Sequence, residues 1–182
     1  MNNQQLIAVK HVYDSLGELM GSPYLQMEFM RKFPQINIQV KDILYMESLR
    51  YMIYIADADD YISTRELNII NYVTGRYLTT DLVDELIEED PDFYINSMPE
   101  VPLTVKIMCE VENSIYRSNN ALESSILKTI ITYFEALTMV VINADNDVTY
   151  GERNRAIEFI DMIKEYAEEN TLSPFWGLDD ED

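Results

Sequence analysis

One short pattern occurs twice in this chain, and each copy joins two apolar stretches. Ala58 to Glu66 reads ADDYISTRE, and Ala144 to Glu152 reads ADNDVTYGE, with each position displaced by 86 residues. The flanking apolar residues align at the same displacement, for example Leu44 with Ile130. We therefore expect two pseudo-symmetric helix-turn-helix hairpins, near residues 40–76 and 126–167. One such hairpin cannot bury its own apolar face, whereas two packed together can.

Helical periodicity continues through the rest of the chain. Apolar residues recur at spacings of three and four, and strict alternation is confined to residues 36–40, a segment too short to form a sheet alone. The sequence predicts an all-α bundle of about eight or nine helices, forming a single domain over residues 1–170. An acidic tail, residues 171–182, follows it, and residues 92–102 are the expected hinge between the halves. The expected helices are 6–20, 24–33, 40–58, 63–76, 80–89, 103–116, 120–143 and 149–167.

The charge of the chain limits its partners. Its 33 acidic residues against 13 basic ones give a formal net charge of −20. This charge opposes binding to nucleic acid or to an anionic membrane, and favours a cation or a basic protein surface. An acid excess that serves only solubility is the simpler interpretation. Residues 126–142 are too short and too polar to span a membrane.

Features of the sequence also predict a cytoplasmic protein. Cys109 is the only cysteine, so the chain forms no internal disulfide, as is usual in a reducing compartment. The first residues lack the pattern of a signal peptide.

The repeated pattern has a purely structural explanation. Ser63 with Glu66, and Thr149 with Glu152, have the spacing of a capping box, in which the hydroxyl and the glutamate each accept from the other's backbone N–H. Such a cap contributes on the order of 1 kcal/mol.

The crowded aspartates suggest a second explanation, a divalent metal site. Carboxylates this close repel one another, and a bound cation with a preference for oxygen ligands, such as Ca²⁺, Mg²⁺ or Mn²⁺, would relieve the repulsion. The pattern is not an EF-hand, because Ile62 replaces the glycine at its sixth position and Asn68 replaces the glutamate at its twelfth. The candidate ligands are Asp57, Asp59, Asp60, Glu66, Asp145, Asp147 and Glu152.

The two segments IADADDYISTRE and VINADNDVTYGE resemble the TerB-like family, named for tellurite resistance. The resemblance covers residues 40–73 and 126–167. It implies an all-helical fold of paired hairpins, divalent metal at the acidic turns, and an accessory role beside a protein partner such as an ATPase or a component of a stress response. The family's usual glycine after the acid pair is absent from both copies, where Tyr61 and Asp147 stand nearby.

Residues typical of catalysis are scarce. His11 is the only histidine, Cys109 lies in an apolar helical run, and no glycine-rich phosphate loop occurs. We therefore expect a non-enzymatic accessory or interaction module that binds a divalent cation. A metal-free protein–protein adaptor and a carboxylate-based metallohydrolase remain open as alternatives. The aromatic pair Phe175-Trp176 in the tail fits either a strap onto the chain's own core or a docking motif.

Overall fold

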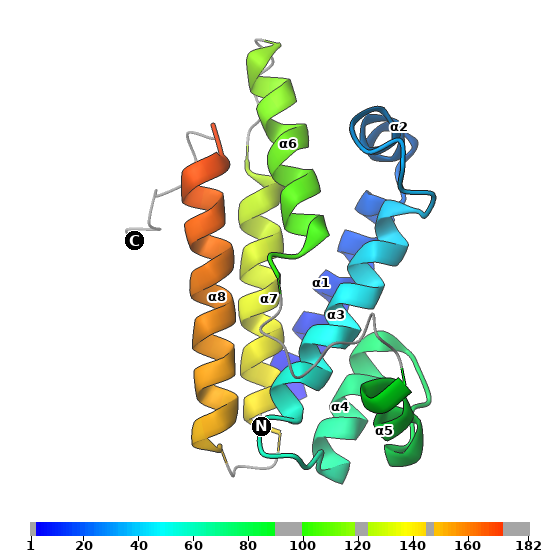
Figure 1. The fold of residues 1–182 in the computed structure, drawn as a ribbon, viewed down its shortest axis with the longest axis vertical. Coiled ribbons are helices and arrows are strands. Elements are labelled where there is room, and N and C mark those ends of the chain that lie inside the picture. The colour runs from blue at the N-terminus through cyan, green and yellow to red at the C-terminus, as the bar shows by residue number, and fades with distance from the viewer. Residues whose placement is uncertain (1–2, 90–99, 119–123, 145–147, 173–182) are drawn as a thin grey trace.

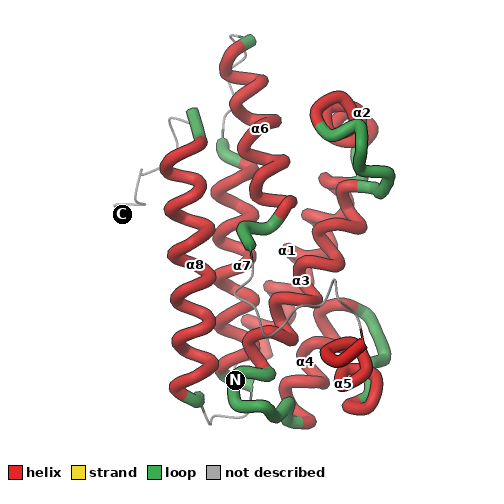
Figure 2. The backbone as a smooth tube through the Cα atoms, viewed as in Figure 1, coloured by secondary structure: helices red, strands yellow, loops and turns green. Residues whose placement is uncertain are grey.

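The computed structural model describes residues 3–89, 100–118, 124–144 and 148–172, and every regular element within them is a helix (Figure 1 and Figure 2). The predicted all-α fold is thus confirmed for this part of the chain. Within it, no helix has the length and apolar character needed to cross a bilayer. The helices are α1 (Asn3–Met20), α2 (Pro23–Lys32), α3 (Val40–Ala56), α4 (Thr64–Thr74), α5 (Thr80–Glu89), α6 (Leu103–Arg117), α7 (Ile126–Ile142) and α8 (Tyr150–Asn170).

The two predicted hairpins form the centre of the bundle. Helix α3 is followed by a tight turn and by α4, and these two helices pack against each other. Helices α7 and α8 also pack against each other. The hairpins meet through α3 and α7, which lie side by side (Figure 1). Helix α1 packs on α3, α4 and α7, whereas α6 packs on α7 and α8. The buried apolar side chains of all eight helices form one cluster.

An aromatic cluster holds the two hairpins together. The rings of Tyr51 on α3 and Phe159 on α8 are stacked with their centroids 3.8 Å apart, and Phe134 on α7 meets both rings edge-on. The Tyr51 hydroxyl also lies 2.6 Å from Oγ1 of Thr138 on α7. Large rings supply much buried area, and the hydrogen bond satisfies the one polar atom that Tyr51 brings into the core.

Several predicted boundaries differ from the structure, and two of them have a clear local cause. Helix α7 begins at Ile126 rather than at residue 120, because Ser125 caps it by accepting from the N–H of Lys128 at 3.0 Å. Helix α3 ends at Ala56, two residues earlier than predicted, where Asp57 takes the C-cap position. Most of the expected hinge, residues 92–102, lies outside the described residues.

Candidate functional site

The first acidic turn joins α3 to α4 and ends in a complete capping box. The Ser63 Oγ accepts from the N–H of Glu66 at 3.2 Å, and the Glu66 carboxylate accepts from the N–H of Ser63 at 2.7 Å. Asp59 and Asp60 are exposed in this turn, and Asp60 has a left-handed backbone with φ of 62°. Aspartate tolerates this conformation better than most residues, which explains part of its presence here.

The second copy repeats the same hydrogen bonds at the start of α8. Oγ1 of Thr149 accepts from the N–H of Glu152 at 3.1 Å, and the Glu152 carboxylate accepts from the N–H of Thr149 at 2.6 Å. Both predicted capping boxes are therefore confirmed. Asp145 and Asp147, the other candidate ligands of this turn, lie outside the described residues.

The two capping glutamates meet between the hairpins. Glu66 is 4% exposed and Glu152 is 3% exposed, and their carboxyl groups hydrogen-bond to each other. Two carboxyl groups form a hydrogen bond only when one of them holds a proton. Burial first, and then this contact, raise the pKa of Glu66 from 4.5 to about 7. A role for either glutamate as a metal ligand stays a prediction, and it would require these hydrogen bonds to be released.

The start of α8 packs directly on the first turn. Arg155 donates to the backbone carbonyl of Tyr54 at 2.7 Å, and its guanidinium lies 4.8 Å from the centre of the Tyr54 ring. A Cβ atom on Gly151 would lie 2.8 Å from the carbonyl oxygen of Ala58, so only glycine fits there without a shift of the backbone.

Asp57 is the most enclosed aspartate of the first turn. Burial is the main cause that raises its pKa, the negative charges of Asp60 and Asp59 add to it, and the guanidinium of Arg155 opposes it. Within the described residues, no three His, Cys, Asp or Glu side chains converge in a group that could hold a metal ion. Because Asp145 and Asp147 are outside those residues, the site of seven candidate ligands stays a prediction.

The two side chains considered for catalysis, His11 and Cys109, lie in different environments. His11 is exposed on α1, whereas Cys109 is buried on α6, where burial raises its thiol pKa to about 11. A thiol with this pKa stays protonated near neutral pH and is a poor nucleophile.

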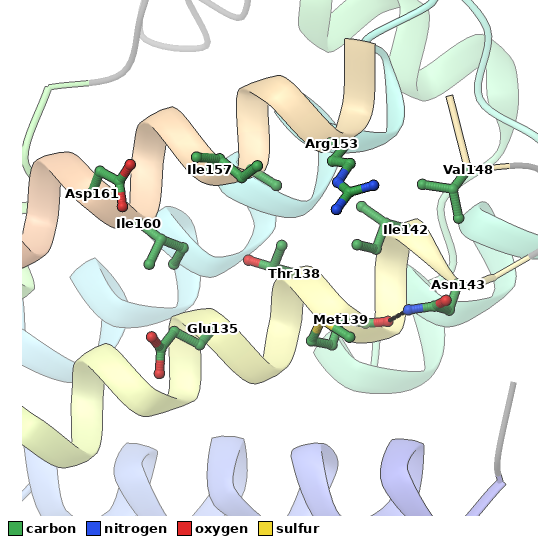
Figure 3. A pocket seen from close by; sticks show the side chains of 11 residues that line it. Glu135, Thr138, Met139, Ile142, Asn143, Val148, Arg153, Ile157, Ile160 and Asp161 are labelled. Carbon is green, nitrogen blue, oxygen red and sulfur yellow. Dashed lines mark hydrogen bonds between the residues drawn. The ribbon is translucent and has the colours of Figure 1, made fainter. Parts of the chain in front are cut away.

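An apolar groove runs between α7 and α8, on the same end of the second hairpin as its acidic turn (Figure 3). Its volume is about 560 Å³. Met139, Val148 and Ile157, which line it, are 55%, 44% and 49% exposed. The remaining lining residues are Glu135, Thr138, Ile142, Asn143, Arg153, Ala156, Ile160 and Asp161.

Charge is distributed unevenly along this groove. Arg153 lies at one end beside Val148 and Ile142, and Glu135 and Asp161 lie at the other (Figure 3). Glu135 is paired with Lys164 at 2.5 Å. Arg153 is exposed, and the structure records no ion pair or hydrogen bond between its side chain and another described residue. The groove is thus apolar in the middle, with an exposed cation at one end.

The corresponding surface of the first hairpin is closed. At the displacement of 86 residues, exposed Met139 matches Ile53, which is 0% exposed, and exposed Val148 matches Ile62, which is 9% exposed. Arg153 matches Leu67, which is half-buried. Helix α1 packs on both α3 and α4, whereas the second hairpin keeps its groove. The pseudo-symmetry is therefore broken on this face.

Two further glutamates, Glu47, which is half-buried, and Glu112, which is buried, were not identified from the sequence. Glu47 on α3 accepts from the backbone N–H groups of Leu103 and Thr104 at the start of α6. Glu112 on α6 is fully buried, and it accepts from the N–H of Leu127 at 2.9 Å at the start of α7. Each supplies, from another helix, acceptors that the capped helix lacks. A glutamate within an apolar helical stretch was the only signal that could have indicated them.

Comparison of the chain with models of protein families, with curated proteins and with solved structures gives no match. The resemblance to the TerB-like family therefore stays a prediction. The functional argument that follows depends on the geometry of the chain itself.

Proposed function

We propose that the chain is a non-enzymatic accessory protein of the cytoplasm, which binds an amphipathic helix of a partner protein in the α7/α8 groove. The observation that carries the proposal is the groove of about 560 Å³, in which Met139 and Val148 are exposed while their counterparts in the first hairpin, Ile53 and Ile62, are buried. Large side chains such as Met139 and Ile157 lose contact with water when such a groove is filled, which favours association.

The dimensions of the groove define the expected partner. Arg153 and Asp161 are eight residues apart on α8, which corresponds to about 12 Å along the helix axis. A docked helix would therefore contribute about two turns, with apolar residues at three- and four-residue spacings. An acidic residue would face Arg153, and a basic one would face Asp161. Methionine adapts its shape to the partner, so Met139 suits a surface of this kind.

Residue-specific photo-crosslinking in cells tests this proposal. A photoreactive amino acid replaces Ile157 in the groove, and the matched control carries it at Ile7, an α1 residue that is 44% exposed. We expect the groove position to capture one recurrent peptide of another protein, amphipathic and carrying an acid near its Arg153 end. The same experiment with Arg153→Glu should lose that peptide.

The readout is the sequence of the captured peptide rather than capture itself. Peptides shared equally by the two positions would contradict the proposal, because they would reflect general exposure. Capture at Ile157 of peptides with no amphipathic pattern would contradict it as well.

A second candidate function is binding of a divalent cation at the first acidic turn. The supporting observation is that Asp59 and Asp60 both raise the pKa of Asp57, a mutual repulsion that a cation would relieve. Ca²⁺, Mg²⁺ and Mn²⁺ are the candidates for such a set of carboxylate oxygens. This function is compatible with the first, because the groove and the turn of Asp57 belong to different hairpins.

A further inference from the structure

The two ends of the α7/α8 groove carry opposite charges, and an exposed apolar residue lies midway between them. On α8, Arg153 and Asp161 are each four residues from Ile157, which corresponds to about 6 Å along the helix axis in either direction. All three side chains are exposed. Glu135 on α7 lies near Asp161 and adds to the acidic end (Figure 3). The α8 side of the groove is therefore a base, an apolar centre and an acid at equal spacing.

A surface with this order of side chains is complementary to a second copy of itself. In a pair of chains related by a two-fold axis, every contact between two different residues occurs twice. If the axis passes through Ile157 and the two α8 helices are antiparallel, Arg153 of each copy faces Asp161 of the other. Ile157 then meets Ile157 of the second copy. One register therefore forms two ion pairs and an apolar contact between them.

The same register also places a cation opposite an exposed aromatic ring. Tyr150 and Lys164 are each seven residues from Ile157, so Tyr150 of one copy faces Lys164 of the other. Seven residues are close to two helical turns, which keeps both side chains on the face of Ile157. Tyr150 is 81% exposed, and a lysine ammonium is attracted to the face of a tyrosine ring.

The charge of this face permits self-association, although the net charge of the chain, −20, opposes it. The charged residues that line the groove are Arg153, Glu135 and Asp161, and Lys164 is paired with Glu135 at 2.5 Å. These two bases and two acids balance, whereas the whole chain has 33 acids and 13 bases. At about 0.15 M salt the Debye length is about 8 Å, so repulsion between more distant exposed charges is largely screened.

We propose that a second copy of the chain covers the α7/α8 groove, with the two α8 helices antiparallel about a two-fold axis at Ile157. Helix α8 of the second copy has the features expected of the partner helix, namely an acid that faces Arg153 and a base that faces Asp161. The second copy therefore competes with the partner, and this regulation rests on the proposed function. Binding of the partner would have to separate the two copies, which lowers its apparent affinity.

Sedimentation velocity over a range of protein concentrations, at about 0.15 M salt, tests the proposal. Arg153→Asp and Asp161→Arg each place like charges opposite each other at both ends of the proposed contact. Glu85→Arg, at an exposed position of α5 across the bundle from α8, is the matched control, because it changes the net charge as much as Asp161→Arg does (Figure 1). Circular dichroism of each variant establishes that it is folded.

We expect the mass of wild type and of Glu85→Arg to rise with concentration from one chain, 21.3 kDa, to twice that value. Each groove variant should remain a single chain, even though Asp161→Arg lowers the overall repulsion. An equal mixture of the two groove variants should regain the dimer, since one then has acids at both positions and the other has arginines at both.

Four results would overturn the inference. They are a wild type that stays a single chain, a dimer that neither groove variant weakens, a mixture that does not regain the dimer, and masses above two copies. The last result would indicate a contact without two-fold symmetry, because a two-fold contact closes at two chains.

The crosslink from Ile157 in cells separates this inference from the proposed function. A wild type that stays a single chain, while Ile157 captures the peptide of another protein, overturns the second copy and leaves the proposed function standing. A dimer that responds to the variants as expected, while Ile157 captures only peptides of this chain itself, overturns the proposed function and leaves the dimer standing.

Discussion

Replacing Glu66 by glutamine should make the protein more stable at alkaline pH. Glu66 and Glu152 are both buried, and their carboxyl groups share a hydrogen bond that requires one proton. Glutamine has nearly the shape of protonated glutamate, and its amide group donates permanently to Glu152. Glutamine is also found in place of glutamate at this position of a capping box, so the hydrogen bond from the N–H of Ser63 is kept.

The magnitude follows from the pKa of Glu66, which is raised from 4.5 to about 7 by burial and by Glu152. A shift of this size corresponds to at most about 3 kcal/mol of unfolding free energy. The folded chain binds the proton more tightly than the unfolded chain does. The stabilisation by the protonated Glu66 is therefore complete below about pH 4.5 and is lost as the pH rises through about 7. The Glu66→Gln variant should keep this stabilisation at every pH in that range.

Urea unfolding at about pH 5 and about pH 8, followed by circular dichroism, measures the effect. We expect wild type and Glu66→Gln to be close at the lower pH, and the variant to be more stable by about 1–3 kcal/mol at the higher pH. The control is Glu165→Gln, at an exposed position of α8, which removes the same formal charge.

Two results would refute this reasoning. If wild type and Glu66→Gln lose stability in parallel between the two pH values, the pair does not hold the extra proton. If Glu165→Gln stabilises the chain as much as Glu66→Gln, the effect comes from the overall negative charge of the chain.

Three further changes test the site and its supports. Gly151→Ala should destabilise by about 1–3 kcal/mol in urea unfolding, because its Cβ would meet the Ala58 carbonyl oxygen at 2.8 Å; a gain, the usual result of this change in a helix, would refute that contact. Glu112→Ala should cost about 1–3 kcal/mol by leaving the buried N–H of Leu127 without its acceptor, and an unchanged unfolding midpoint would contradict this. If the acidic turns bind metal, adding Ca²⁺, Mg²⁺ or Mn²⁺ at a hundred times its dissociation constant to the chelator-treated chain should stabilise it by about 2.7 kcal/mol in a thermal melt, and Asp59→Asn should abolish the gain. Coincident melting curves at matched ionic strength would reduce the pattern to a repeated cap.

Local hydrogen bonds were predictable from the sequence, because they depend on spacing alone. The bond between Ser63 and Glu66 and that between Thr149 and Glu152 join residues three apart, and both formed as expected. The contact between Glu66 and Glu152 was not predictable in this way, since it depends on how the two hairpins pack.

Bonds between distant helices explain the other residues that the sequence did not indicate. Helix α6 begins after Pro102, which offers no side-chain cap, and its first N–H groups are satisfied by Glu47, more than fifty residues earlier. Helix α7 has a serine cap but Lys128 where a capping box has an acid, and Glu112 of α6 takes that role. A missing local acceptor can be seen in a sequence, but the residue that replaces it is fixed only by tertiary packing.

The groove illustrates the same limit and indicates where function belongs in this fold. Ile53 and Met139 occupy equivalent positions, and both continue an apolar helical stripe, so periodicity predicts burial for each. Only Ile53 is buried, on a hairpin against which α1 packs. Both helix starts use the capping pattern, so its repetition has an explanation in stability whether or not a metal binds there. The face that differs between the hairpins is free of that requirement, and we therefore look for the partner at Met139 and Ile157 before the turns themselves.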